Sequence, residues 1–141
     1  MSMTRLTIAQ AIVRFLAAQH SERDGRQARL IPGMWAIFGH GNVSGLGQAL
    51  EEYGDAVNLP TYRPQNEQSM VHLAAAYAKH TGRMSTFACA ASVGPGSVNM
   101  LTAAAGATVN RVPVLLFPAD YFANRLPTRF CSSSSTRSST T

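Results

Sequence analysis

Apolar positions recur along this chain in two patterns, one helical and one typical of buried strands. Near the N-terminus, Ile8, Ile12 and Leu16 form a stripe at helical spacing. Thr7 begins a capping-box sequence, which is a common start of a helix. The pattern therefore predicts a first helix over about residues 7–19.

Four short segments further along resemble strands, and some are continuous apolar runs of the kind that parallel sheets bury on both faces. The predicted strands lie at residues 34–38, 57–60, 85–90 and 114–117. The predicted helices between them lie at about residues 44–52, from 67 onward, and at 96–108. A polar, arginine-rich stretch at residues 21–29 predicts a solvated loop. This alternation predicts an α/β fold, with a parallel sheet, helices on both faces and right-handed crossovers.

The chain length allows one domain with a substantial core, because 45% of the 141 residues are hydrophobic. No apolar run approaches the ~18 residues of a membrane span, and Arg14 interrupts the first helix, unlike a secretory signal. We therefore expect a cytoplasmic protein. From residue 128 the composition changes to serine and threonine, so we expect a folded domain at 1–127 and a disordered tail at 128–141.

Charge and cysteine content exclude several classes of function. The net charge of +5 comes mostly from arginines scattered singly, without the basic stripe or stacking aromatics that favour nucleic-acid binding. Cys89 lies in a predicted buried strand and Cys131 in the tail, so the sequence predicts neither a disulfide framework nor a metal site. The four histidines are not clustered either.

Two glycine-rich turns follow predicted strands. Residues 39–45 look like a dinucleotide-binding fingerprint, but such a site needs an acidic residue at the end of the next strand, and residues 57–61 contain none. Residues 94–96 lack the lysine of a phosphate-binding loop. Both turns still mark the edge where α/β sheets bind ligands.

One acidic residue stands at the start of an otherwise apolar helix. Glu67 follows a polar loop, and Met70, Leu73, Ala74 and Tyr77 then fall on one helical face. Glu67 is therefore directed at whatever that face contacts. A carboxylate at a helix N-terminus can also serve only to complement the helix dipole, and the pattern alone leaves both readings open.

Three segments together resemble the N-terminal pyrimidine-binding domain of thiamine-diphosphate enzymes of the acetolactate-synthase and decarboxylase type. In that family a glutamate opens a helix that ends in small residues and Tyr-Ala, and a later strand leads into Gly-Pro-Gly with Asn three residues on. The matching residues are Glu67, Tyr77, Ala78, Gly94, Pro95, Gly96 and Asn99. Within the superfamily, the closer resemblance is to the hydrolases that open a cyclic trihydroxy dione in inositol breakdown. The resemblance covers about residues 4–127, and its most specific parts are residues 37–42, 45–50, 66–68, 92–96 and 107–111.

The resemblance implies a thiamine diphosphate site. Glu67 takes the role of the carboxyl group that hydrogen-bonds the ring nitrogen N1′ of the aminopyrimidine, for which it should be protonated or share a proton. Pro95 and Asn99 match positions that line the aminopyrimidine, although a proline is also common at the first position of a helix. Gly41 and Asn42 match a loop that faces the reaction centre in relatives.

Four further residues have less specific indications. His40 is a candidate proton carrier. Asp120 matches a position that is often polar on the cofactor side. Arg111 and Cys89 are interpreted as structural.

The resemblance also implies that parts of the family's site are missing. In relatives a second domain, usually of another subunit, supplies a Gly-Asp-Gly motif and a later Asn that hold magnesium and the diphosphate, and this chain contains no such motif. We therefore expect a truncated product, inactive alone, from a homo-oligomeric enzyme that acts on a small cyclic dione. The family normally continues after residue 127 with a sequence whose codons, read out of register, give the Phe-Cys-Ser-Ser of residues 130–133, so we expect a frameshift there.

Two alternatives remain open from the sequence. One is a thiamine-dependent decarboxylase or acetolactate-type synthase, which would act on pyruvate. The other is a non-catalytic α/β domain that dimerises through an exposed apolar face.

Overall fold

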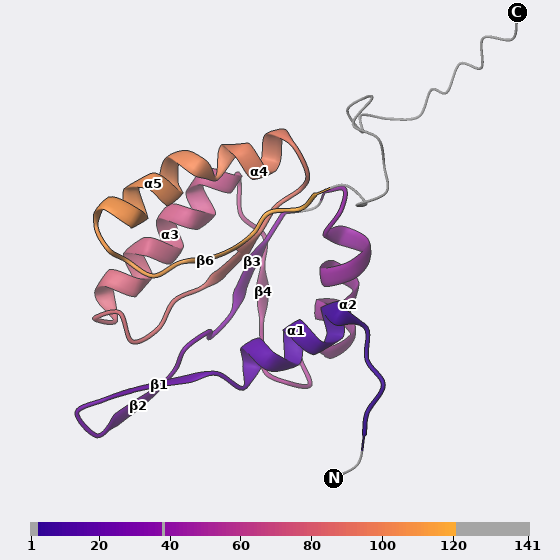
Figure 1. Ribbon diagram of the computed structural model, residues 1–141, viewed down its shortest axis with the longest axis horizontal. Coiled ribbons are helices and arrows are strands. Elements are labelled where there is room, and N and C mark those ends of the chain that lie inside the picture. The colour runs from indigo at the N-terminus through magenta and orange to yellow at the C-terminus, as the bar shows by residue number, and fades with distance from the viewer. Residues whose placement is uncertain (1–2, 38, 121–141) are drawn as a thin grey trace, which may run out of the picture.

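The computed structural model describes residues 3–37 and 39–120 of the chain. Within these residues a parallel sheet of four strands lies at the centre, in the order β4, β3, β5, β6 (Figure 1). The strands are β3 (Met34–Ala36), β4 (Thr61–Tyr62), β5 (Ala88–Ala90) and β6 (Leu115–Phe117). Met34 pairs with Thr61 on one side and with Ala88 on the other.

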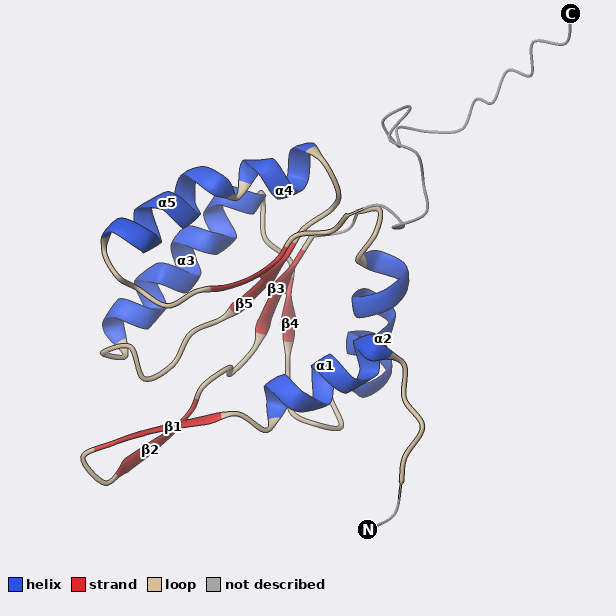
Figure 2. Ribbon diagram, viewed as in Figure 1, coloured by secondary structure: helices blue, strands red, loops and turns tan. Residues whose placement is uncertain are grey.

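Helices cover both faces of this sheet (Figure 2). On one face lie α1 (Ile8–Ala17) and α2 (Gln48–Tyr53). On the other lie α3 (Glu67–His80) and α5 (Leu101–Val109), and the short helix α4 (Pro95–Asn99) packs against α3 at one end. The predicted α/β fold with helices on both faces is confirmed.

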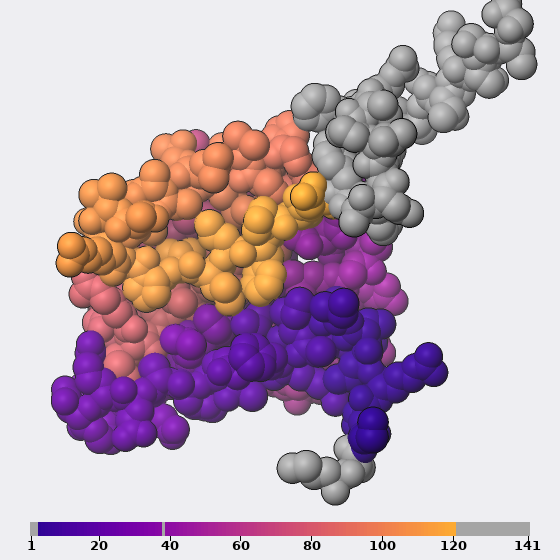
Figure 3. Space-filling view, viewed as in Figure 1, coloured from indigo at the N-terminus to yellow at the C-terminus, as the bar shows by residue number. Residues whose placement is uncertain are grey.

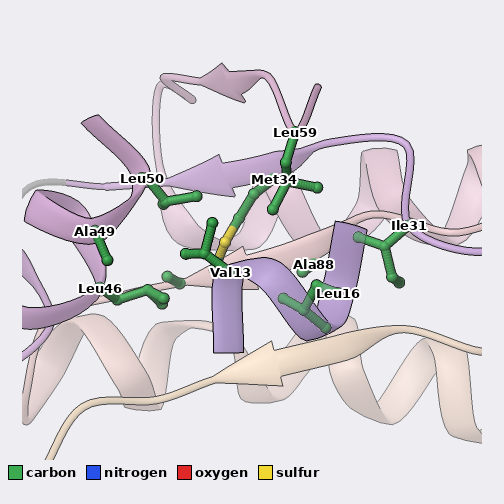
Figure 4. Packing of buried hydrophobic residues seen from close by; sticks show 10 residues of the cluster. Val13, Leu16, Ile31, Met34, Leu46, Ala49, Leu50, Leu59 and Ala88 are labelled. Carbon is green, nitrogen blue, oxygen red and sulfur yellow. The ribbon is translucent and has the colours of Figure 1, made fainter. Parts of the chain in front are cut away.

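The first helix begins where its capping box predicts. The Thr7 side chain accepts a hydrogen bond from the Gln10 N–H at 3.2 Å, and the Thr7 N–H donates to Gln10 Oε1 at 2.9 Å. From α1, Val13 and Leu16 join the core that contains Met34 of β3, and the Val13 side chain points toward Met34 (Figure 4). The buried residues of this core are Val13, Leu16, Ile31, Met34, Leu46, Ala49, Leu50, Leu59, Ala88 and Ala90.

The second core lies between the sheet and the α3–α5 layer. Met70, Val71 and Ala74 of α3 pack against Cys89 of β5 and against Met100, which separates α4 from α5. The Cys89 thiol donates to the Met70 carbonyl with a sulfur–oxygen distance of 3.6 Å. Burial raises the pKa of this thiol to about 12. Cys89 therefore stays protonated at neutral pH, as expected of a structural residue.

The polar stretch at residues 21–29 is not the solvated loop that the sequence predicted. It forms a β-hairpin, in which β1 (His20–Arg23) pairs antiparallel with β2 (Arg26–Arg29). Asp24 and Gly25 join the strands with φ values of 53° and 73°. Positive φ at both central residues is typical of the type I′ turn, which favours Asp-Gly. The turn signal was present, but both strands are largely exposed and lack apolar alternation.

The second parallel strand lies later than residues 57–60, where it was predicted. Arg29 donates to the carbonyl oxygens of Val57, at 3.1 Å, and Asn58. Asn58 also has a φ of 54°. These bonds hold the segment in a turn, so pairing with β3 begins only at Thr61.

Two predicted helices are each divided in the structure. The helix predicted at residues 44–52 begins as a π-helix, η1 (Val43–Gly47), and continues as α2. The helix predicted at 96–108 is interrupted at Met100, whose N–H donates to the Ser97 carbonyl at 3.3 Å, three residues back.

The edge strand β6 lies at the surface between α1 and α5 (Figure 3). In the part of the chain that the structure describes, no helix combines the length and apolar character that crossing a membrane requires. The predicted tail at 128–141 lies outside the described residues.

Candidate active site

Glu67 is the first residue of α3, as the sequence predicted. The preceding Asn66 caps the helix, because its Oδ1 accepts a hydrogen bond from the Ser69 N–H at 2.8 Å. A capped start fixes where the first turn begins and therefore where the half-buried Glu67 side chain lies.

The turn after β5 brings a second helix start to the same place. Gly94 has a φ of 61°, a conformation that favours glycine, and Pro95 is the first residue of α4. At the end of this short helix, Asn99 Nδ2 donates to Glu67 Oε2 at 2.7 Å. Two residues that are 32 positions apart in the sequence are therefore joined by one short hydrogen bond.

Gly96 packs closely against both Ser92 and the carboxyl group of Glu67. A Cβ placed on Gly96 would lie 2.2 Å from Ser92 Oγ and 3.1 Å from Glu67 Oε1. The backbone of α4 thus approaches Glu67 more closely than any side chain there would allow. The result is an open pocket of about 430 Å³, lined by Glu67, Pro95, Gly96, Val98 and Asn99.

Ser97 ties the first turn of α4 to the sheet. Its hydroxyl lies 2.6 Å from the carbonyl oxygen of Ser92 and 3.3 Å from that of Ala119. The pocket wall is therefore anchored to the ends of two neighbouring strands.

The glycine turn after β3 is arranged differently. Asn42 Nδ2 donates to the carbonyl oxygens of Ala91, at 3.0 Å, and Phe117, at 2.8 Å. Gly41 has a φ of 94°, and a Cβ there would lie 2.6 Å from Ala119 Cβ. Neither Gly41 nor Asn42 lines the pocket that contains Glu67.

A larger cavity lies on the opposite face of the sheet. It has a volume of about 660 Å³, and core residues such as Leu46 and Leu50 line it together with Asn42. Glu67 is not among its lining residues. The carboxyl group and its partners thus belong to the smaller pocket.

The other candidates lie outside the pocket with Glu67. His40 is exposed, and its carbonyl accepts a hydrogen bond from the Val93 N–H at 3.1 Å. Asp120 is exposed at the last described residue. Their proposed roles, and those of Gly41 and Asn42, stay predictions. Within residues 3–37 and 39–120, no three His, Cys, Asp or Glu side chains gather in a way that could hold a metal ion.

One residue of this site was missed by the sequence reasoning. Gln68 Nε2 donates to Asn99 Oδ1 at 3.2 Å, so both polar atoms of the Asn99 side chain are used within the protein. Adjacent residues of a helix do not share a face, so periodicity gave no reason to group Gln68 with Glu67.

Comparison with known families shows to which family the chain belongs. Residues 36–133, well over half of the chain, match the family model described as thiamine pyrophosphate enzyme, N-terminal TPP binding domain. The chain belongs to this family of thiamine pyrophosphate enzymes. The matched region includes Glu67, the Gly94–Gly96 turn and Asn99. The resemblance drawn from the sequence is thereby confirmed at the level of the family.

Individual members of the family are similar over nearly the whole chain. The chain is 54% identical over 127 residues to 3D-(3,5/4)-trihydroxycyclohexane-1,2-dione hydrolase of Bacillus cereus (strain AH820) and to the hydrolase of the same name from Bacillus anthracis. It is 54% identical over 125 residues to the hydrolase of Bacillus thuringiensis (strain Al Hakam). These matches cover 89–90% of this chain but only 19% of each relative. The chain thus spans about a fifth of the length of these relatives.

Proposed function

We propose that this chain forms the pyrimidine-binding half of a thiamine diphosphate site, in which Glu67 hydrogen-bonds N1′ of the aminopyrimidine ring. The observation that carries the proposal is the Glu67–Asn99 hydrogen bond at the wall of the pocket beside the Gly94–Gly96 turn. A capping glutamate that only complemented the helix dipole would need neither this partner nor this pocket.

The pocket residues fit an aminopyrimidine. Glu67 Oε2 is engaged by Asn99, while Oε1 lies beside the backbone of Gly96, and both residues line the pocket. Pro95 and Val98 contribute apolar surface against which a ring can pack. In this proposal Glu67 hydrogen-bonds the ring nitrogen N1′, Asn99 positions Glu67 through its hydrogen bond, and Pro95 contacts the ring.

The reaction is proposed from the relatives. Their printed name describes hydrolases of 3D-(3,5/4)-trihydroxycyclohexane-1,2-dione, and we propose the same small cyclic dione as substrate for the whole enzyme, opened to 5-deoxyglucuronate. Bound thiamine diphosphate would supply the electron sink for cleavage of a carbon–carbon bond. The chain spans a fifth of its relatives, so we propose that magnesium and the diphosphate are held by the remainder of the longer enzyme.

We further propose that the whole enzyme is a cytoplasmic homo-oligomer. Large apolar side chains are exposed on the α3–α5 layer, namely Leu73, Val98, Leu101 and Val109. Exposed apolar side chains of this kind are typical of surfaces that another subunit covers. Sedimentation analysis of the whole enzyme tests this, and a monomer would contradict it.

A chimaera tests the proposed function. The matching segment of the Bacillus cereus hydrolase is replaced by the 127 matched residues of this chain, and ring opening is measured with thiamine diphosphate and magnesium. We expect Glu67→Gln to reduce the rate at least about 100-fold, because an amide cannot share a proton with N1′. Glu51→Gln is the matched control, since Glu51 also lies in the first turn of a helix, and it should leave the rate unchanged.

Two results would contradict the proposal. If Glu67→Gln left the rate of ring opening unchanged, Glu67 would not have the proposed role. A chimaera that consumed pyruvate and ignored the cyclic dione would favour the synthase alternative.

A further inference from the structure

Gln68 connects the two helices that form the pocket. It is the second residue of α3, and its Nε2 reaches across to Asn99 Oδ1 on α4 at 3.2 Å. Asn99 Nδ2 in turn donates to Glu67 Oε2 at 2.7 Å. The three side chains form a line of two hydrogen bonds that starts on α3, crosses to α4 and returns to α3.

The direction of these bonds decides how Glu67 is presented. An asparagine side chain has a donating and an accepting end, so a reversed Asn99 amide would point Oδ1 at a carboxyl oxygen of Glu67. With Gln68 donating to Oδ1, the donating end of Asn99 faces Glu67 and its Oε2 is an acceptor. A proton on the carboxyl group then belongs on Oε1, the oxygen beside Gly96.

We propose that Gln68 is a positioning residue, which orients the Asn99 amide so that Glu67 accepts through Oε2 and shares its proton through Oε1 with the bound aminopyrimidine. This inference rests on the proposed function of Glu67. Gln68 itself does not line the pocket, so it acts through Asn99 and not by contact with the ring.

The test uses an isosteric reversal of the donor. In the 141-residue chain, Gln68→Glu keeps the shape of the side chain but replaces its donor with an acceptor, whereas Gln68→Leu removes the bond. Gln48→Glu is the matched control, because Gln48 is an exposed residue in the first turn of α2 and does not line the pocket. Thermal unfolding of each variant checks that the fold is retained.

Two readouts separate the inference from the proposed function. The first is the pair of side-chain N–H signals of Asn99 in a chain labelled with ¹⁵N-asparagine, assigned by their loss in Asn99→Ser. The second is calorimetric binding of 4-amino-5-(hydroxymethyl)-2-methylpyrimidine, the aminopyrimidine part of the cofactor. The first needs no ligand, so it reports on the orientation of Asn99 even if the probe does not bind.

We expect both Gln68 variants to shift the Asn99 signals and Gln48→Glu to leave them in place. Probe affinity should fall about fivefold in Gln68→Leu, the effect of one lost hydrogen bond. It should fall further in Gln68→Glu, because a reversed amide draws the Glu67 proton to Oε2. Asn99 signals and affinities in the Gln68 variants that match those of Gln48→Glu would overturn the inference. Failure of the unmodified chain to bind the probe would instead count against the proposed function.

Discussion

Two glycine turns leave the same edge of the sheet, one after β3 and one after β5, yet only the second carries the candidate site. In the first, Asn42 donates both its hydrogen bonds to carbonyl oxygens at the ends of neighbouring strands. In the second, Asn99 donates to a side chain, Glu67, at the wall of a pocket. A position at the carboxyl edge of a parallel sheet is therefore not sufficient for a site. The difference is the partner of each asparagine amide, which is backbone carbonyl oxygen for Asn42 and the Glu67 carboxyl group for Asn99.

The two turns also depend on one another through Ser92. A Cβ on Gly39 would lie 2.1 Å from Ser92 Cβ, and one on Gly96 would lie 2.2 Å from Ser92 Oγ. Ser92 therefore fits between the two turns only because both neighbours are glycine. We call the turn at residues 39–45 the closed turn and the turn at residues 94–96 the open turn, and both pack against Ser92.

The largest expected loss of stability comes from adding a methyl group at Gly39, next to Ser92. Gly39→Ala should destabilise the chain by about 3 kcal/mol, because the new methyl group meets Ser92 Cβ and, at 3.0 Å, its Cα, and backbone must move to accommodate it. Urea denaturation followed by circular dichroism measures the change.

The matched control for this prediction is another Gly→Ala change with free space around it. Gly106 lies within α5, and a Cβ there would meet nothing within 4 Å. Gly106→Ala should raise stability by about 0.5–1 kcal/mol, since alanine is the better helix former. Equal effects of the two substitutions would show that the two turns are not packed as described.

The next largest effects distinguish a structural role of Asn42 from a binding role of Asn99. Asn42→Ala should cost about 2 kcal/mol, because the Ala91 carbonyl oxygen loses its side-chain donor and the Phe117 carbonyl oxygen keeps only the Ala91 N–H. Asn42→Ala should leave the affinity for the pyrimidine probe unchanged. Asn99→Ala should instead lower that affinity about tenfold and reduce stability less than Asn42→Ala does.

Urea denaturation and calorimetric binding of the same two variants provide this comparison. If Asn42→Ala lost affinity for the pyrimidine probe without losing stability, the turn at residues 39–45 would be part of the site. The contrast between the two turns would then be wrong.

The sequence predicted the parts of the fold that depend on neighbouring residues or on burial. The capping box at Thr7 and the central strand at Met34 are of this kind, since a local hydrogen bond and an apolar run identify them. The β1–β2 hairpin was missed because its strands bury few side chains, although the sequence Asp24-Gly25 is typical of a hairpin turn.

The site was only partly accessible from the sequence for a related reason. Asn42 and Asn99 are the same residue type, each close after a glycine turn, and their different partners depend on which atoms the folded chain brings within reach. Glu67 could be selected by its place at the start of an apolar helix and by resemblance. Gln68 lies in one of the segments that resemble the family, but nothing in the sequence indicates that its side chain reaches Asn99, 31 positions away.

A smaller effect tests how the open turn is held. Ser97→Ala should cost about 1 kcal/mol, because the hydroxyl that links α4 to the carbonyl of Ser92 is lost. If α4 is held chiefly by this bond, hydrogen exchange of its amides should also become faster than in the unmodified chain. Exchange that is unchanged in α4 would mean that packing against α3 alone fixes the helix. Thr108→Ala is the control, since its exposed hydroxyl bonds only a carbonyl of its own helix.

The smallest effect concerns Pro95, for which a structural and a functional reading both remain. Pro95→Ala should cost about 0.5 kcal/mol of stability, because proline at the first helical position restricts the unfolded chain. If Pro95 also contacts the aminopyrimidine, affinity for the pyrimidine probe should fall about threefold through lost apolar contact. Pro113→Ala is the control, since Pro113 is an exposed proline that does not line the pocket. A fall in stability without a fall in affinity would leave Pro95 as a helix-starting residue, and the residues proposed to face the ligand in the pocket would be Glu67, Val98 and Asn99.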